Sequence, residues 1–261
     1  MESTLFEIKE LCKYFGGVKA VDKVNIKIRK GIIYGIIGPN GAGKSTLFNV
    51  LTGHLSTTSG DIYFENKKIT DLPPHKITRL GIARTFQNIK LFKYMNVLVN
   101  VKIGFHTKTK TNFWDAIFHT STYNHDERLT IKKGLEILER VGLTDFAYDY
   151  ALNLSYGIQR KLEIARALAA DPTVLLLDEP TAGMNPVETN QIIKFIRQLN
   201  QEGLTIIIIE HDMKVIMNLC SRIAVLNEGK KICEGIPREV QTDKDVIKAY
   251  LGKSNLLKFK K

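Results

Sequence analysis

The sequence has few cysteines and no long apolar run. Its three cysteines, Cys12, Cys220 and Cys233, are odd in number and far apart, so they support neither a disulfide framework nor a CxxC metal or redox site. They suit a reducing compartment. Nowhere do about 18 apolar residues follow one another, which argues against a membrane-spanning helix. The N-terminal residues are partly acidic and lack an apolar segment, so we expect no secretory signal peptide.

Glycine and proline are also not abundant. The 19 glycines and 7 prolines in 261 residues exclude a collagen-like or low-complexity chain. With 44% hydrophobic and 25% charged residues, the chain can bury a sizeable core, so we expect one or two globular domains.

Acidic residues are outnumbered by basic ones. The 38 basic and 27 acidic residues give a formal net charge of +11, which suggests an anionic partner: nucleic acid, phosphates or a membrane surface. The excess is spread thinly except for lysines in residues 253–261, and such a charged end is usually a solvated terminus. Charge alone therefore leaves all three partners open.

The first part of the chain predicts strands followed by a glycine loop. Apolar and polar residues alternate over residues 24–29, which is typical of a half-buried strand, and residues 5–9 suit a partner strand. The apolar run at 32–37 leads into a glycine-rich segment, 38–43, and helical character resumes over 44–51. This order is strand, loop, helix.

Two later apolar runs predict further core strands. Residues 173–177 and 204–209 are leucine-rich or β-branched, and a helical pattern over 186–201 separates them. Strands that alternate with helices in this way form parallel sheets, so the sequence predicts an α/β fold.

Residues 88–168 differ from the rest of the chain. Helical spacing over 97–103, 113–118 and 131–141 predicts an inserted helical subdomain. Residues 106–128 are polar and aromatic without clear periodicity, so loops or short helices are expected there. The glycine loop has no second copy, which predicts one nucleotide site per chain.

The glycine segment fits the P-loop pattern of glycine, four residues, glycine, lysine and serine or threonine. Its residues are Gly38, Pro39, Asn40, Gly41, Ala42, Gly43, Lys44 and Ser45, followed by Thr46. Glycines let backbone N–H groups turn toward phosphate oxygens, and the helix N-terminus adds its positive dipole. Lys44 is expected to reach the β- and γ-phosphates, and the Ser45 hydroxyl to ligate magnesium.

Two carboxylates, Asp178 and Glu179, follow a predicted buried strand. Ligands of open α/β sheets bind at this end of the strands, so Asp178 is expected to hold the metal and Glu179 to accept a proton from the attacking water. An acidic pair alone is more often a helix cap or the start of a loop. Together with the glycine loop, the metal and base roles are favoured.

With these motifs, the chain resembles the nucleotide-binding subunits of ATP-binding cassette (ABC) transporters. Gln87 follows the predicted strand 81–86, as the Q-loop glutamine of the family does. Residues 154–160 occupy the place of the LSGGQ signature, and residues 180–185 occupy the place of the D-loop. His211 occupies the place of the switch histidine. The resemblance implies a P-loop ABC ATPase fold, with a parallel core sheet, an N-terminal antiparallel β subdomain and an inserted helical subdomain. It also implies ATP and Mg²⁺.

The resemblance assigns roles to residues that would not stand out singly. Phe15 takes the place of the aromatic that stacks on adenine, although Tyr14 beside it is an alternative. Gln87 is expected to contact magnesium or the attacking water, and His211 to donate to the γ-phosphate. Read alone, Phe15 could equally well be a core aromatic, Gln87 is more often a surface amide, and His211 is more often a loop histidine.

The signature segment departs from LSGGQ at two positions. Ser155 and Gly157 are present, whereas Tyr156 replaces the first glycine and Ile158 replaces the glutamine. In the family this segment caps the γ-phosphate held by a partner subunit, through a serine hydroxyl and backbone N–H groups at a helix N-terminus. Ser155 and Gly157 are therefore expected to contact nucleotide in the partner.

A narrower resemblance rests on three segments, residues 81–92, 163–168 and 210–213. They are similar to those of the ATP-binding protein of branched-chain amino acid importers, over about residues 5–252. Leucine, isoleucine and valine are then the implied solutes, with urea, short amides or other amino acids as alternatives, since such subunits do not contact the solute.

The resemblance also implies an organisation and partners. The whole chain, 1–261, would be one ABC ATPase domain: a core of about 1–87 and 169–252, a helical subdomain of 88–168 and a basic tail of 253–261. A membrane permease, a second ATP-binding subunit in a head-to-tail dimer and, indirectly, a periplasmic or lipid-anchored solute-binding protein are the implied partners. The location would be peripheral, at the cytoplasmic face of the membrane.

Two other classes of protein share some of these features. A soluble cassette ATPase acting on nucleic acid would suit the net charge, but the chain has neither a second cassette nor a long coiled coil between P-loop and signature, so no nucleic-acid partner is expected. A non-hydrolysing regulator is suggested by Ile158. The presence of Lys44, Asp178, Glu179 and His211 argues against it.

Overall fold

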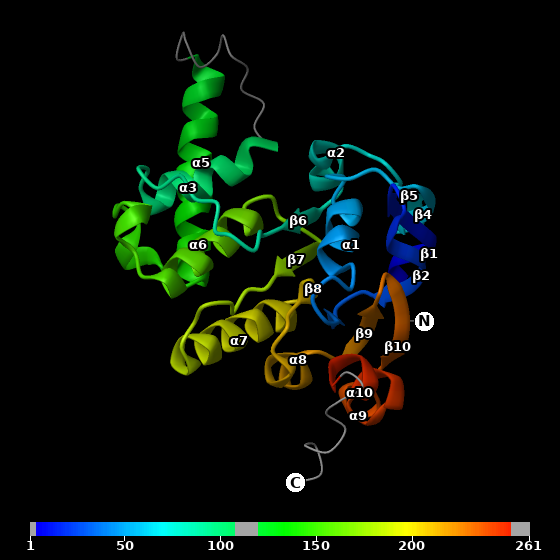
Figure 1. Cartoon of the computed structure of the whole chain (residues 1–261). Helices are drawn as coiled ribbons and strands as arrows, with labels where there is room; N and C mark the ends of the chain where they lie inside the picture. The colour runs from blue at the N-terminus through cyan, green and yellow to red at the C-terminus, as the bar shows by residue number, and fades with distance from the viewer. Residues whose placement is uncertain (1–3, 108–119, 252–261) are drawn as a thin grey trace.

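The computed structural model describes residues 4–107 and 120–251 (Figure 1). These residues form a four-stranded sheet, in the order β2-β1-β4-β5, and a six-stranded sheet, in the order β10-β9-β3-β8-β7-β6. The strands are β1 (Thr4–Phe15), β2 (Val18–Arg29), β3 (Ile33–Ile37), β4 (Ser59–Phe64), β5 (Lys67–Lys68), β6 (Ile82–Arg84), β7 (Val174–Asp178), β8 (Thr205–Ile209), β9 (Arg222–Asn227) and β10 (Lys230–Gly235).

Helices pack against the six-stranded sheet and form most of the connections between its strands. The α-helices are α1 (Lys44–Leu51), α2 (Pro74–Arg79), α3 (Val97–Ile103), α5 (Ser121–Arg140), α6 (Tyr156–Leu168), α7 (Pro186–Gln201), α8 (Met213–Leu219), α9 (Pro237–Thr242) and α10 (Lys244–Leu251). The described residues also include the short 3₁₀ helices η1 (Gly104–Thr107), η2 (Thr144–Phe146) and η3 (Ala151–Asn153).

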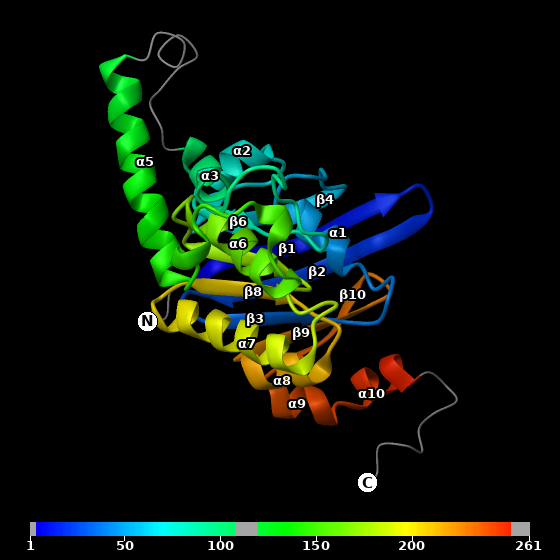
Figure 2. The same ribbon diagram turned by 90° about the vertical axis from the view of Figure 1, so that its left-hand side faces the viewer.

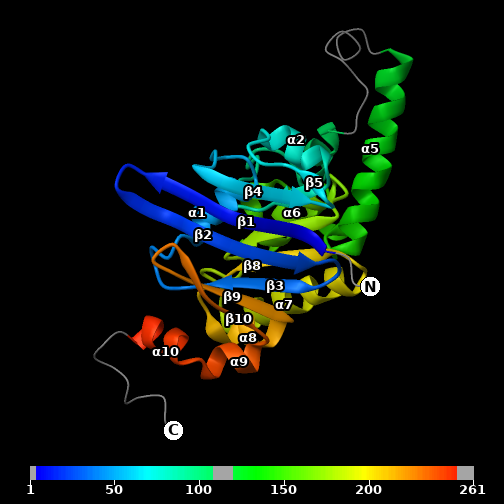
Figure 3. The same ribbon diagram turned by 90° about the vertical axis from the view of Figure 1, so that its right-hand side faces the viewer.

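The four-stranded sheet is antiparallel, and its strands alternate between apolar and polar residues. In β2, Val24, Ile26 and Ile28 are buried while the residues between them are exposed. The long hairpin of β1 and β2 pairs antiparallel, and β4 adds to the other edge of β1. Figure 3 shows this sheet on the near side of the molecule.

The six-stranded sheet is parallel except at one edge. Strands β9, β3, β8, β7 and β6 pair parallel, and β10 pairs antiparallel with β9. The central strands β3, β7 and β8 are buried along their whole length, which explains why their sequences are continuous apolar runs. The predicted α/β class with a parallel core sheet is confirmed.

Alternate residues of the core strands lie on opposite faces of the sheet and belong to two different hydrophobic clusters. Leu175 and Leu177 of β7 join the cluster formed with α3, α5, α6 and α7, whereas Leu176 joins the cluster formed with α1 and the antiparallel sheet. Figure 2 shows α7 and α8 on the side opposite the antiparallel sheet. The core sheet is therefore the middle layer, and α1 packs between the two sheets.

The segment between β6 and β7 consists mainly of helices. The expectation of loops or short helices over 106–128 is wrong for its second half, because α5 begins at Ser121 and continues for 20 residues. Two interactions support this early start: Thr120 Oγ1 accepts a hydrogen bond from the Tyr123 N–H at 3.3 Å, and Glu127 pairs with Lys102 of α3. The predicted helical segment 113–118 lies outside the described residues.

The predicted core elements agree closely with the structure. The helix expected at 186–201 is α7, which begins with a capping box formed by Asn185 and Glu188. Strands β4, β5, β9 and β10 were not predicted. Within residues 4–107 and 120–251, no helix is both long and apolar enough to cross a membrane.

Truncation of Leu176 tests the buried position of β7. We expect Leu176→Ala to lower the free energy of unfolding by about 2–5 kcal/mol, because the lost methyl groups leave a cavity between β7 and α1. Urea unfolding followed by circular dichroism measures the change. The control is Val187→Ala on the exposed side of α7, for which a change above about 0.5 kcal/mol is not expected. Equal effects of the two substitutions would contradict the assigned packing.

Candidate active site

The carboxyl ends of β3, β7 and β8 meet at one edge of the core sheet. Ile36 of β3 and Asp178 of β7 are both in register with Ile209 of β8, which lies between them. The loops that follow these three strands therefore begin side by side at this edge. This edge brings together the glycine loop, Glu179 and His211, which lie far apart in the sequence.

The glycine loop is held close to neighbouring backbone. Gly38 has φ +155°, and a Cβ there would lie 2.2 Å from the Leu226 carbonyl oxygen. Gly43 has φ +100°, and its Cβ would lie 2.1 Å from the Ala20 carbonyl oxygen. Only glycine fits at these two positions. The Ala42 N–H donates to the Pro39 carbonyl at 3.1 Å, which closes the loop.

Lys44 and Ser45 begin α1 directly after this loop. The Lys44 ammonium donates to the carbonyls of Gly38 at 2.7 Å and Pro39 at 3.1 Å, so the side chain folds back over the loop. Burial lowers the pKa of Lys44, and the nearby carboxylates of Glu179 and Asp178 oppose that shift. Ser45 is exposed and Thr46 is half-buried.

Asp178 is the last residue of β7, and its carboxylate is nearly buried. Its Oδ2 pairs with Arg84 Nη2 at 2.7 Å, and the side chains of Arg84 and Asp178 are only 8% and 6% exposed. The pair uses one carboxylate oxygen and does not involve Oδ1. Asp178 also lies near enough to Lys44 to influence its pKa.

Glu179 is brought together with Gln87 and His211. Its backbone has φ +45°, a left-handed conformation that is uncommon outside glycine and asparagine. Its Oε2 accepts a hydrogen bond from Gln87 Nε2 at 2.9 Å and lies 3.8 Å from His211 Nδ1. The three side chains predicted to act on the attacking water, the magnesium or the γ-phosphate are thus neighbours in space.

Glu210, the residue after β8, is hydrogen-bonded to the loop that follows β7. Its side chain is fully buried and accepts hydrogen bonds from the Thr181 N–H at 2.9 Å and from Thr181 Oγ1 at 2.6 Å. His211 beside it is 60% exposed, with Nδ1 lying 3.8 Å from Glu210 Oε2. The histidine ring is therefore open to a ligand while its backbone is held.

Arg160 of α6 holds the backbone around Gln87. Its guanidinium is fully buried, donates to the carbonyls of Phe86 at 2.7 Å and Gln87 at 2.8 Å, and pairs with Glu163 at 2.8 Å. A buried charge is stable only with such partners. Helix α6 is therefore linked directly to the segment that carries Gln87.

Ser155 and Gly157 lie apart from the glycine loop of their own chain. Ser155 is the exposed N-cap residue of α6, and its side chain makes no capping hydrogen bond. Over the described residues, no hydrogen bond or ion pair joins either residue to residues 38–45. Tyr156 packs near Gly183, and Ile158 packs against the core, so both departures from the signature have structural contacts.

Phe15 and Tyr14 differ in environment. The Tyr14 hydroxyl donates to Asp22 at 2.7 Å, and its hydrogen bonds with Cys12 and Asp22 raise the Tyr14 pKa. Phe15, at the end of β1, is 47% exposed, and the Lys13 ammonium lies 5.1 Å from its ring centroid. Phe15 is therefore the aromatic of the two that is open for stacking.

Three residues with important contacts were not assigned roles from the sequence: Arg84, Arg160 and Glu210. All three lie in segments that carry the family resemblance, and this was the available signal. Apart from Glu163, which pairs with Arg160 at i,i+3 spacing, their partners are remote in sequence: Asp178 for Arg84, residues 86 and 87 for Arg160, and Thr181 for Glu210. No local pattern could identify these remote pairs.

The geometry is that of a P-loop nucleotide-binding site: a glycine loop between a strand and a helix, beside the acidic end of a neighbouring strand. A family model described as "ABC transporter" matches residues 21–182, and one described as "Branched-chain amino acid ATP-binding cassette transporter" matches residues 230–254. The chain belongs to the ABC transporter family, and it is an ATP-hydrolysing cassette of that family.

Individual relatives cover almost the whole chain. The high-affinity branched-chain amino acid transport ATP-binding protein BraF of Pseudomonas aeruginosa is 43% identical over 97% of this chain and 100% of its own length. The corresponding protein LivG of Escherichia coli is 40% identical over 97% of this chain and 100% of its own length. A crystal structure of a nucleotide-free ATP-binding cassette superimposes with a TM-score of 0.84 at 35% identity, covering 96% of this chain and 100% of that one. The resemblance inferred from the sequence is confirmed.

Proposed function

We propose that this chain is the ATP-hydrolysing subunit of an importer of branched-chain amino acids. The observation that carries the proposal is the 43% identity to BraF over the full length of that protein, together with the match of residues 230–254 to a model for branched-chain amino acid cassettes. Related cassettes for urea, short amides or other amino acids are the alternative, because the chain itself need not contact the solute.

ATP would bind at the carboxyl edge of the core sheet. Backbone N–H groups of the glycine loop and of Thr46 would hold the phosphates, and Lys44 would exchange its contacts with the Gly38 and Pro39 carbonyls for phosphate oxygens. Phe15 would stack on adenine. The positive φ angles of Gly38 and Gly43 support this, since they give the loop a backbone conformation that favours glycine and that phosphate-binding loops use.

Magnesium fits the donors at this edge. The Ser45 hydroxyl, an Asp178 oxygen and the Gln87 amide oxygen are hard oxygen ligands of the kind Mg²⁺ prefers, and the rest of its shell would come from phosphate and water. Bound Mg²⁺ would neutralise the charge that develops on the phosphates.

Glu179 is proposed as the general base. Its Oε2 is held by the hydrogen bond from Gln87 Nε2, so Oε1 would be the oxygen that accepts the proton of the attacking water. His211 would donate to the γ-phosphate as charge builds up there. The exposed ring beside Glu179 supports this role.

The site is proposed to be completed by a second ATP-binding subunit. Ser155 and Gly157 lie at a helix N-terminus that, among the described residues, has no hydrogen bond or ion pair with its own glycine loop, so a head-to-tail partner could place the same segment over the γ-phosphate. Either an identical chain or a related one fits this arrangement.

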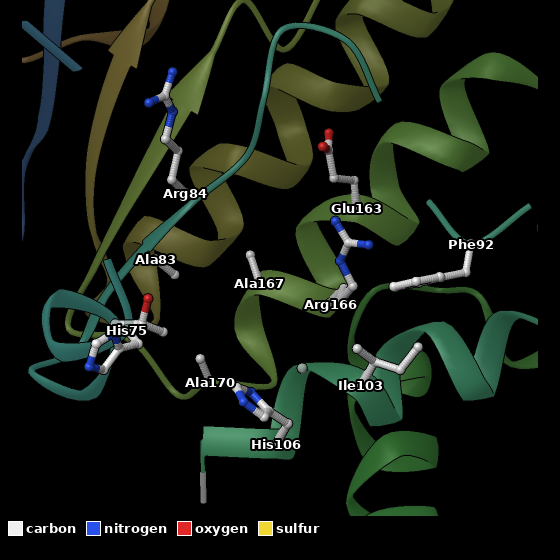
Figure 4. Close-up of a pocket in the computed structure, with 12 residues that line it drawn as sticks. His75, Ala83, Arg84, Phe92, Ile103, His106, Glu163, Arg166, Ala167 and Ala170 are labelled. Carbon is white, nitrogen blue, oxygen red and sulfur yellow. The ribbon is translucent and has the colours of Figure 1, made fainter. Parts of the chain in front are cut away.

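A cavity of about 320 Å³ offers a docking place for the permease (Figure 4). It lies between α2 and β6 on one side and η1 on the other, with Ala167 of α6 and Ala170, just after that helix, between them. Phe92, five residues after Gln87, lines it and is 46% exposed. A permease segment inserted here would press on the helices that Arg160 links to Gln87.

These contacts would hold the chain at the cytoplasmic face of the membrane. A solute-binding protein would act through the permease without touching this chain. Nucleic acid is not a proposed partner, because the sequence shows neither a second cassette nor a long coiled coil between the P-loop and the signature.

Replacing the proposed base tests the assignment of Glu179. We expect Glu179→Gln to bind ATP with nearly unchanged affinity and to lose turnover by a factor on the order of a hundred or more, because an amide cannot accept the proton. Equilibrium binding of a fluorescent ATP analogue and steady-state phosphate release measure the two effects. Hydrolysis at the wild-type rate would refute the base assignment.

The docking cavity is tested by Phe92→Ala, with Tyr94→Ala as the matched control. Tyr94 is 83% exposed but does not line the cavity. We expect Phe92→Ala to weaken association with the permease about tenfold or more, since buried aromatic anchors carry much of the energy of interfaces. Affinity for ATP should not change. A larger loss in the Tyr94 variant would place the contact elsewhere.

Uptake by the reconstituted transporter tests the solute. We expect proteoliposomes containing this chain, its permease and its companion ATPase subunit, with the solute-binding protein outside, to accumulate radiolabelled leucine in the presence of internal ATP. Vesicles with the Glu179→Gln chain are the control and should accumulate little. Uptake of urea without uptake of leucine would favour the alternative cassette class.

A further inference from the structure

Arg84 makes contacts that the proposed mechanism does not yet use. It is the last residue of β6, the strand that pairs with β7, and its side chain is 8% exposed. A buried guanidinium is costly unless its donors find partners. Its partners come from two other elements, β7 and the segment formed by α1 and its C-cap.

On one side, Arg84 holds the carboxylate of Asp178. Nη2 donates to Oδ2 at 2.7 Å, and the pair is nearly closed to water. A charge-assisted hydrogen bond of this kind is short and strong, so it holds Oδ2 in place. Because Oδ2 is held by Arg84, Oδ1 is the carboxylate oxygen that remains to ligate a metal.

On the other side, Arg84 is anchored to α1 and its C-cap residue, Thr52. Nη1 donates to Asn49 Oδ1 at 2.7 Å and to Thr52 Oγ1 at 3.1 Å. Helix α1 begins with Lys44 and Ser45. One guanidinium therefore joins the helix that carries Ser45 to the strand that carries Asp178.

Two aromatic rings confine the guanidinium between these anchors. Its central carbon lies 5.6 Å from the ring centroid of Phe48 and 5.1 Å from that of Phe86. Arg84 Nε is buried and has no hydrogen-bond partner. The two terminal nitrogens thus carry the hydrogen bonds of the group, so its orientation is set by Asp178, Asn49 and Thr52.

We propose that Arg84 is a positioning residue that presets Asp178 and Ser45 for the Mg²⁺ of the bound nucleotide. It holds one oxygen of Asp178, leaves the other for the metal and fixes the separation of the two metal-ligating elements before nucleotide arrives. The proposal rests on the metal roles of Asp178 and Ser45 under the proposed function. Arg84 itself does not touch the nucleotide.

A lysine would serve this purpose only in part. The ammonium introduced by Arg84→Lys could pair with Asp178, but it lacks the planar fork that reaches Asp178 and Asn49 together. Arg84→Gln would remove the charge and leave the buried carboxylate without its ion-pair partner. The two substitutions therefore separate the contribution of charge from that of geometry.

The test measures nucleotide binding by the full chain as a function of Mg²⁺. A fluorescent ATP analogue is titrated in EDTA and then at a series of Mg²⁺ concentrations. In Arg84→Gln we expect the Mg²⁺ concentration for half-maximal strengthening of binding to rise about tenfold, the size typical for loss of a residue that supports a metal ligand. Affinity in EDTA should change less than about twofold, and Arg84→Lys should recover part of the Mg²⁺ response.

The control is Arg79→Gln, which removes an exposed arginine at the end of α2 and should leave the Mg²⁺ response as in the wild type. An unchanged Mg²⁺ midpoint in folded Arg84→Gln would overturn the proposal. An equal loss of affinity with and without Mg²⁺ would also overturn it, because it would indicate a general disturbance of the site.

Two further outcomes are distinguishable. If wild-type binding does not respond to Mg²⁺, the metal roles of Asp178 and Ser45 fail and this proposal fails with them. If Arg84→Gln does not fold, the double substitution Asn49→Ala, Thr52→Val takes its place, because it keeps the pair with Asp178 and removes both anchors on the α1 side. We then expect a several-fold rise in the Mg²⁺ midpoint, and an unchanged midpoint would overturn the proposal.

Discussion

The parallel pairing of β3, β8 and β7 is the constraint on which the site depends. Because these strands run in the same direction and share register around Ile209, the segments that follow them emerge at one edge of the sheet. The glycine loop, the acidic end of β7 and His211 are thereby neighbours. Burial of the strands on both faces makes this arrangement rigid, since each strand packs against helices on one side and α1 with the antiparallel sheet on the other.

Buried arginines connect this edge to the rest of the molecule. Arg84 joins Asp178 to α1, and Arg160 joins α6 to the backbone at Gln87. Each guanidinium is buried and must keep its partners, so neither connection can loosen without a large loss of stability. Movement of the helices around α6 would therefore reach Gln87 and, through its hydrogen bond, Glu179. Under the proposed function, this would give a physical path between a permease docked in the cavity and Glu179.

Much of the core could be predicted because its signals are local. The glycine spacing of residues 38–45 and the apolar runs of β3, β7 and β8 each lie within a few consecutive residues. The start of α5 at Ser121 was not predicted, because its first half is polar and is supported by the N-cap Thr120 and the contact of Glu127 with α3. The pair of Arg84 with Asp178 joins residues 94 positions apart, and such pairs follow from topology and not from any local pattern. The proximity of Gln87, Glu179 and His211 agrees with the expectation, while their catalytic roles stay predictions.

The most direct test is a crystal structure of the chain with Mn²⁺ and a non-hydrolysable ATP analogue, with the metal located by its anomalous scattering. We expect Mn²⁺ between Ser45 and Asp178, the γ-phosphate between Lys44 and His211, and the pair of Arg84 with Asp178 Oδ2 retained. A nucleotide bound elsewhere, or a metal that makes no contact with the edge formed by β3, β7 and β8, would contradict the assigned site.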